Sequence, residues 1–343
     1  MATRTRNDEA DSHKEAQKAQ KECSDFYPFC ALCASLWPSL RVATIEIAGI
    51  RGNEDAPAAV KPPAPFLAAI LLAVLTAWPA RAESPGEAAA EQLGWHLATK
   101  AYTFRAITLY ETIEITHSLG LKYFELNPTQ KLSAENPVNT NDTLTPELRA
   151  ALKAKFAAAG IKVANYGVVK LTKDEAADRK VFDFAKDMGI ETIVSEPEAG
   201  SFDLLDKLTA EYGINVAIHN HPKPSQYFDP QIVLDAIQGH SARIGACADV
   251  GHWTRSGLNA VECLHKLSGH VITLHFKDVN DQKKDVPWGT GLTDVKGMLT
   301  ELHQQKFHGV FSMEYEGPTG EQLIDELKQS IGFFDQTVAH LTP

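Results

Sequence analysis

Short apolar runs and helix-type patterns alternate along residues 94–341. The runs are rich in β-branched and aromatic residues, as buried strands are, and the stretches between them space apolar residues as amphipathic helices do. Strands that alternate with helices predict βα units and a parallel sheet. Eight strands are expected, near Trp95–Thr103, Lys122–Asn127, Lys162–Val169, Glu191–Glu196, Asn215–His221, Ile244–Asp249, Val271–Lys277 and Gly309–Glu316.

Helices are expected between these strands, and several end at a glycine that can adopt the left-handed conformation that closes a helix. Eight βα units of this size predict an α/β fold in which the sheet closes as a (β/α)8 TIM barrel. Residues 128–145, rich in Asn, Thr and Pro, are expected to form a loop after the second strand. The closing glycines are Gly120, Gly160, Gly189 and Gly213, and the expected helices include Thr145–Ala159, Asp174–Met188, Phe202–Tyr212, Pro230–Gln238, Ala260–Leu267, Val295–Gln305 and Glu321–Leu341.

The segment before the predicted barrel has a different pattern. Residues 66–78 form a 13-residue uncharged run that is followed by Pro-Ala-Arg-Ala. The run is shorter than the about 20 apolar residues of a membrane span, but it suits a signal peptide that ends in a small-x-small cleavage site. We therefore interpret residues 60–82 as a signal peptide cleaved after Ala82. This predicts a periplasmic or secreted protein that has no membrane contact after cleavage. A retained anchor and a buried helix of a cytoplasmic protein are the alternatives.

Residues 1–59 fit poorly in front of a signal peptide, which normally begins only a few residues before its apolar region. We expect this stretch to be a disordered or mistranslated extension, with a translation start at Val60 as one hypothesis. The 261 residues of 83–343 then match the size of a single TIM-barrel domain. Two of the five cysteines, Cys247 and Cys263, lie in that domain. We expect two buried thiols there and no disulfide.

Composition and charge exclude two classes of protein, a disordered chain and a nucleic-acid-binding protein. The chain is 44% hydrophobic and 22% charged, which supplies enough apolar surface for a folded core. Residues 1–82 carry nine basic and nine acidic residues, so the net charge of −11 lies entirely in residues 83–343. Nucleic-acid binding depends on clustered Lys and Arg, and nucleic acid is therefore not expected as a partner.

Five successive predicted strands end in carboxylates and imidazoles, at the end of a TIM barrel where active sites are built. Charged groups that point into a barrel lose hydration unless they pair or bind a metal ion. Carboxylate oxygens mixed with imidazole nitrogens suit one Mn²⁺, Mg²⁺, Co²⁺, Fe²⁺ or Zn²⁺ ion with open positions for a substrate. Any one of these residues is more readily a surface charge, but the set favours a metal site. The ends read Ser195-Glu196-Pro197-Glu198, His219-Asn220-His221, Asp249-Val250-Gly251-His252, His275-Phe276-Lys277-Asp278 and Glu314-Tyr315-Glu316.

These motifs, together with Pro287-Trp288-Gly289-Thr290-Gly291, resemble the xylose isomerase-like sugar isomerase/epimerase family across the whole predicted barrel. The resemblance implies that one residue on each of the last four strands holds a single divalent metal ion. The matching positions are His219, Asp249, His275 and Glu314. Family members usually carry Glu where His219 stands, and the change favours Zn²⁺, Co²⁺ or Fe²⁺ over Mg²⁺.

The reaction implied by the resemblance is removal of a proton from the carbon beside a sugar carbonyl, because a divalent ion stabilises the enediolate that forms. Reprotonation then gives isomerisation or epimerisation, and loss of a neighbouring group gives β-elimination. Glu196 is the predicted base, with a further metal ligand or a structural ion pair as its alternatives. His221, His252 and Lys277 are predicted proton carriers or oxyanion partners. An ion pair with Asp278 is an equal alternative for Lys277.

Trp253, Trp288 and Glu316 are the predicted substrate contacts, because indole rings stack on sugars and Glu316 shares a strand face with Glu314. Tyr315 is a further aromatic candidate. Each of these aromatic residues is as readily part of the core.

Export and the lack of a Gly-rich phosphate loop favour a non-phosphorylated small-molecule sugar or keto-glycoside as the substrate. The first alternative to an isomerase or epimerase is a metal-dependent lyase or hydratase of 3-keto-glycosides, which the resemblance implies for exported members. The second is a non-catalytic sugar-binding barrel in which His219 marks the loss of catalysis. A metal-dependent nuclease of the endonuclease IV type is a third, and the acidity of the domain weighs against it. A homo-oligomer is compatible with the sequence.

Overall fold

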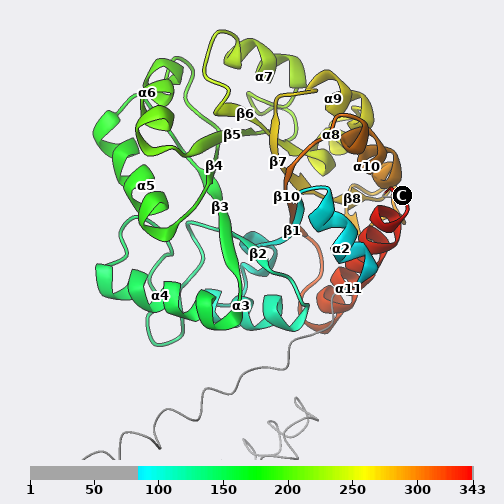
Figure 1. The fold of residues 1–343 in the computed structure, drawn as a ribbon, viewed down its shortest axis with the longest axis horizontal. Helices are drawn as coiled ribbons and strands as arrows, with labels where there is room; N and C mark the ends of the chain where they lie inside the picture. The colour runs from blue at the N-terminus through cyan, green and yellow to red at the C-terminus, as the bar shows by residue number, and fades with distance from the viewer. Residues whose placement is uncertain (1–83, 342–343) are drawn as a thin grey trace, which may run out of the picture. The chain divides into compact units, whose positions relative to one another are not determined.

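The computed structural model describes residues 84–341, and in this range eight parallel strands close into a barrel (Figure 1). The strands follow one another around the barrel in the order β1-β10-β7-β6-β5-β4-β3-β2. The α/β prediction of a (β/α)8 TIM barrel is therefore confirmed. The strands are β1 (Trp95–Lys100), β2 (Tyr123–Leu126), β3 (Lys162–Val169), β4 (Thr192–Ser195), β5 (Asn215–His219), β6 (Ile244–Asp249), β7 (Val271–Phe276) and β10 (Gly309–Met313).

Helices surround the barrel and cover the outer face of the sheet (Figure 1). The local signals act as expected, because the side chains of Thr145 and Asp174 cap the helices that follow them. Gly160, Gly189 and Gly213 close three helices in the left-handed conformation. The helices are α2 (Pro85–Gln92), α3 (Leu109–Ser118), α4 (Pro146–Ala159), α5 (Glu175–Met188), α6 (Phe202–Tyr212), α7 (Pro230–Ile237), α8 (Val250–Arg255), α9 (Ala260–Lys266), α10 (Val295–Gln304) and α11 (Gly320–Ala339).

Several strands end earlier than the sequence pattern predicts. After β1 the chain turns into a short 3-10 helix, Ala101–Phe104. After β5 and β10 it leaves the sheet at the polar residues that follow His219 and Met313. Directly after β7, a small antiparallel hairpin is made of β8 (Asp278–Val279) and β9 (Asp285–Val286). This hairpin, α2 and α8 were not predicted from the sequence.

The hydrophobic core lies mainly between the sheet and the helices, where large side chains such as Trp95, Phe182 and Phe311 are buried. The barrel interior is different. Small apolar groups such as Ala98 and Ala217 fill part of it, and buried polar residues including Lys100 and Glu125 fill the rest. Burial of charge in a barrel interior calls for partners close by.

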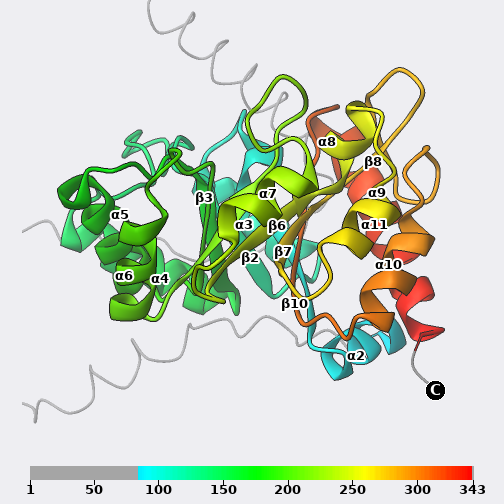
Figure 2. The same ribbon diagram turned by 90° about the horizontal axis from the view of Figure 1, so that it is seen from above.

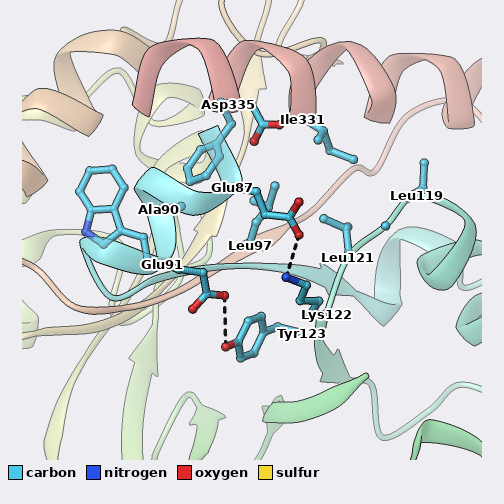
Figure 3. A pocket seen from close by; sticks show the side chains of 13 residues that line it. Glu87, Ala90, Glu91, Leu97, Leu119, Leu121, Lys122, Tyr123, Ile331 and Asp335 are labelled. Carbon is cyan, nitrogen blue, oxygen red and sulfur yellow. Dashed lines mark hydrogen bonds and ion pairs between the residues drawn. The ribbon is translucent and has the colours of Figure 1, made fainter. Parts of the chain in front are cut away.

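Helix α2 packs against α11 at the end of the barrel opposite α8 (Figure 2). Ser84 caps α2 and its hydroxyl donates to Asp335 of α11 at 2.7 Å. Glu87 forms an ion pair with Lys122 across a small cavity of about 40 Å³ (Figure 3). A cavity of this size has room for about one water molecule and no sugar.

Cys247 and Cys263 are buried free thiols, as predicted. No helix within residues 84–341 is long and apolar enough to cross a membrane. The predicted extension at residues 1–59 and the predicted signal peptide at 60–82 lie outside the described residues.

Candidate metal centre and its cavity

Four predicted ligands come together at the carboxyl ends of neighbouring strands. His219 and Asp249 are the last residues of β5 and β6, and His275 lies near the end of β7. Glu314 directly follows β10. Strand register pairs Asp249 with His275, and the barrel order places β5, β6, β7 and β10 side by side. The topology therefore converts four distant sequence positions into one cluster.

The ligand atoms of this cluster all lie within 4.8 Å of one another, and all four residues are buried. His219 Nε2 lies 3.4 Å from Asp249 Oδ2, and His275 Nδ1 lies 3.0 Å from Glu314 Oε2. Three of the atoms, Asp249 Oδ2, His275 Nδ1 and Glu314 Oε2, form no hydrogen bond. Buried polar atoms without a hydrogen bond are rare, and a divalent cation would be coordinated by the lone pairs that all three atoms present. The donor set fits the metal site that was predicted.

Lys277 lies beside this cluster and is fully buried. Its ammonium group contacts Asp249 Oδ2 at 2.9 Å, Glu314 Oε2 at 3.2 Å and Glu316 Oε1 at 2.6 Å. Burial alone would lower the pKa of Lys277, but these carboxylates outweigh it and raise the pKa above its usual value. Lys277 is therefore charged and compensates part of the negative charge of the ligands.

The alternative of an ion pair between Lys277 and Asp278 is wrong. Asp278 points the other way and accepts backbone N–H groups of Gly289, Gly291 and Thr293 at 2.8–3.0 Å. Because neighbouring residues on an extended chain face opposite sides, Lys277 faces the cluster while Asp278 holds the loop after β9.

A cavity of about 690 Å³ opens above the cluster. This volume lies in the range of small-molecule binding sites. Six of the predicted site residues line the cavity: Glu196, His221, His252, Glu314 and Glu316, and His219 at its floor. The opposite wall carries Lys100, Tyr102, Asn127, Pro128, Thr129 and Lys170.

Glu196 and His221 form a hydrogen-bonded pair at the rim. Glu196 Oε1 lies 2.5 Å from His221 Nδ1 and also accepts the backbone N–H of His221 at 3.2 Å. Burial alone would raise the pKa of Glu196, but the hydrogen bond from His221 and the nearby ring of His219 hold it well below its usual value. The same hydrogen bond raises the pKa of His221. Glu196 is therefore a weak base, and it orients the ring of His221.

His252 has a contrasting environment on the same side of the cavity. Burial lowers its pKa to about 3, so the ring is neutral at pH 7. Arg255 lies 3.1 Å from His252 Nδ1 and can only donate, so Nδ1 accepts and the proton of the ring lies on Nε2. Nε2 faces Asp249 and Glu316 at 3.6 and 3.8 Å. His252 is thus a neutral N–H donor.

The prediction that Trp253 and Trp288 contact a substrate is not supported by their positions. Both side chains are buried in the hydrophobic core, and neither lines the cavity. The Trp288 ring packs against Phe276, with ring centroids 4.9 Å apart. Tyr315 is buried in the same core. Trp253 lies in α8 and Trp288 in the loop after β9, beyond the ends of the strands, and the prediction rested on residue type alone.

Sequence reasoning missed Lys100, Glu125 and Arg255. Glu125 accepts a hydrogen bond from His275 Nε2 at 2.8 Å, and Lys100 lies 2.8 Å from the same carboxylate oxygen. The available signal was a charged residue near the end of each of the first two predicted strands. The site prediction rested on the ends of the later five strands alone.

An eight-stranded barrel with clustered His, Asp and Glu side chains at the carboxyl ends of its last strands places the protein among TIM barrels whose site could hold a metal ion. Residues 113–337 match the model of the xylose isomerase-like TIM barrel family. The chain belongs to that family. The resemblance drawn from the sequence motifs is therefore confirmed.

Solved structures support the same fold. An uncharacterized protein from Parabacteroides distasonis is 35% identical, with coverage of 70% of this chain and 98% of that one and a TM-score of 0.59. A D-tagatose 3-epimerase-like protein is 15% identical, with 71% and 98% coverage and a TM-score of 0.58. The IOLI protein, whose structure holds a zinc atom, is 18% identical, with 70% and 98% coverage and a TM-score of 0.55. The comparison with curated proteins gave no match.

Proposed function

We propose that this protein is a divalent-metal-dependent enzyme that acts on a non-phosphorylated sugar by removing a proton next to a carbonyl group, as a sugar isomerase or epimerase. The observation that carries the proposal is the buried cluster of His219, Asp249, His275 and Glu314 at the floor of a sugar-sized cavity. Family membership supports it, and so does the likeness to an epimerase-like protein.

The four ligands would hold one divalent cation, and two imidazoles with two carboxylates favour Zn²⁺, Co²⁺ or Fe²⁺ over Mg²⁺. The zinc atom in the IOLI structure is consistent with this choice. A bound cation supplies stabilisation of the negative charge that develops on the sugar oxygens as the proton leaves. Glu316, at the cavity wall, is placed to accept a sugar hydroxyl.

The proton-transfer roles follow from the two histidine environments. His221 is oriented by Glu196 through Nδ1, which leaves Nε2 as the nitrogen that can take a proton from the substrate. His252 is neutral and presents an N–H group, so it can donate to a sugar oxygen. We therefore assign the base to the Glu196–His221 pair, with the proton on His221, in place of Glu196 alone. Lys277 stabilises charge behind the ligands and does not line the cavity.

A lyase or hydratase acting on 3-keto-glycosides is a second candidate, and one distance favours it over an epimerase, though not over an isomerase. The rings of His221 and His252 have centroids only 5.3 Å apart, so no sugar fits between them. The pair therefore acts on one face of a substrate. Elimination and isomerisation can proceed on a single face, whereas epimerisation by two groups needs them on opposite faces.

The test is to incubate the metal-loaded protein with aldoses, ketoses and 3-keto-glucosides in D₂O and follow them by NMR. Deuterium entering the carbon next to the carbonyl would support proton abstraction, and the products would separate isomerase, epimerase and lyase. Sugar binding without any exchange would support a non-catalytic receptor and contradict the proposal.

The proposal of a non-phosphorylated substrate also rests on export. We propose that residues 60–82 direct the chain out of the cytoplasm and are removed after Ala82. N-terminal sequencing of the purified protein from its natural host should then begin at Glu83. A sequence that begins upstream of residue 60 would contradict export and reopen sugar phosphates as substrates.

A further inference from the structure

Glu125 lies on β2 inside the barrel, is fully buried and is not among the residues that line the cavity of about 690 Å³. Its carboxylate reaches across the barrel to His275 on β7, although β1 and β10 separate these strands in the barrel order. A side chain that spans the interior in this way connects the metal cluster to the opposite wall.

Each of the two carboxylate oxygens of Glu125 accepts two hydrogen bonds. On Oε1 it accepts from His275 Nε2 and from Lys100 Nζ, each at 2.8 Å. On Oε2 it accepts from the hydroxyl of Ser312 at 2.6 Å and from the amide of Asn165 at 3.3 Å. The four donors come from β7, β1, β10 and β3. Glu125 is therefore fixed in one orientation.

A buried polar network of this kind stabilises a barrel interior less than apolar side chains would. Interior layers of TIM barrels are usually made of Val, Ile and Leu. A buried ion pair gives little net stability compared with apolar packing of the same volume, because both charges lose their hydration. A role beyond packing would account for the ionised groups at this depth, and the one group of the cluster that they contact is His275.

We propose that Glu125 is a positioning residue that fixes the ring of His275 with its proton on Nε2 and so presents Nδ1 to the metal ion. This inference rests on the proposed function, because it requires that the cluster binds a metal. The geometry carries it: Nε2 donates to Glu125, whereas Nδ1 forms no hydrogen bond and lies 3.0 Å from Glu314 Oε2. Carboxylates placed behind metal-binding histidines have this effect on orientation and on ligand strength.

The second histidine of the cluster provides a comparison. The outer nitrogen of His219, Nδ1, lies 3.7 Å from Glu196 Oε1 and forms no hydrogen bond. Glu196 is instead engaged by His221. His275 is thus the ligand whose ring is held in advance, and loss of its partner should have the larger effect on metal binding.

The experiment compares Glu125→Gln with Ser312→Ala in the full chain. Glu125→Gln keeps the shape but removes the charge that holds His275. Ser312→Ala removes a donor to the other oxygen of the same carboxylate and leaves the bond to His275 intact. The dissociation constant for Zn²⁺ is measured by competition with a chelator, and the melting temperature of each metal-free variant is recorded. We expect Glu125→Gln to weaken Zn²⁺ binding by about 10- to 100-fold, and Ser312→Ala by less than about 3-fold by the same reasoning.

A second measurement follows the Nε2 proton of the His275 ring. In ¹H–¹⁵N spectra of the Zn²⁺-loaded wild type, the Nε2 proton of His275 should give a slowly exchanging signal, and in Glu125→Gln this proton should exchange faster. Equal weakening of Zn²⁺ binding in both variants, or unchanged binding in Glu125→Gln, would overturn the inference. If the wild type itself binds no divalent ion, the proposed function fails instead, and the two failures are distinguishable.

Discussion

Among single residues, the site depends on which buried nitrogen and oxygen atoms form no hydrogen bond within the protein. Asp249, His275 and Glu314 each present one buried atom that forms no hydrogen bond. Their types and their places at strand ends were predictable from the sequence. The partner of His275 was not, because Glu125 lies 150 residues away along the chain and is brought close only by barrel closure.

The Glu196–His221 pair gives the first prediction at this scale. His221→Gln should lower the rate of deuterium exchange into a substrate by about 10²- to 10⁴-fold, because the proton acceptor is lost. Glu196→Gln should also lower the rate, since the ring loses its carboxylate partner. Both variants should retain the metal ion, which is checked by elemental analysis. If His221→Gln exchanges protons at the wild-type rate, the assignment of the base is wrong.

Lys277 gives the second prediction. Its ammonium is buried against Asp249 and Glu314, and it compensates their charge when no metal ion is bound. Lys277→Met should therefore destabilise the metal-free protein by about 3–5 kcal/mol, because a buried charge loses its partner. The loss should be smaller in the Zn²⁺-loaded protein, in which the ion supplies the compensating charge. Thermal unfolding with and without Zn²⁺ measures the difference, and an equal loss in both states would contradict this role.

At the scale of elements, the hydrophobic pattern predicted the strands well, since β3 and β6 have the bounds that were expected. Buried parallel strands form continuous apolar runs that stand out in a sequence. Short elements were not predicted, because they contain no such run. Helix α8 and the hairpin β8–β9 are too short to show a period, and their residues are set by contacts around the site, such as the bond from Arg255 to Asp285.

The packing of α2 on α11 gives a prediction for an element. A Cβ atom added at Gly86 would lie 2.3 Å from the backbone of Asp335, so the two helices approach as closely as glycine allows. Gly86→Ala should destabilise the protein by about 1–3 kcal/mol, because α2 must shift away. Gly332→Ala on α11 is the control, since an added Cβ would meet nothing within 4 Å.

The control should be neutral or stabilising by up to about 1 kcal/mol, because Ala favours a helix more than Gly does. Urea unfolding measures both variants. Equal stability of the two would show that α2 does not depend on this close approach.

For the whole molecule, closure of the barrel assembles a cluster of ligands that no single segment of the chain contains. Four ligands from four strands meet at one end because the strands are parallel and neighbouring. The polar network around Glu125 links that end to strands on the far wall. The fold class could thus be predicted from the hydrophobic pattern, and the ligand set from residue types at strand ends. The cavity wall and the positions of Trp253 and Trp288 depended on where the chain leaves each strand.

The most direct test of the central claim is the metal content of the purified protein after dialysis against each divalent ion in turn. Wild type should retain one ion per chain, with Zn²⁺, Co²⁺ or Fe²⁺ held more tightly than Mg²⁺. Asp249→Ala should retain none, because too few ligands remain, while Asp183→Ala, at an exposed carboxylate on α5, should behave as wild type. A wild-type protein that retains no ion, or an Asp249→Ala variant that binds one as tightly, would contradict the account.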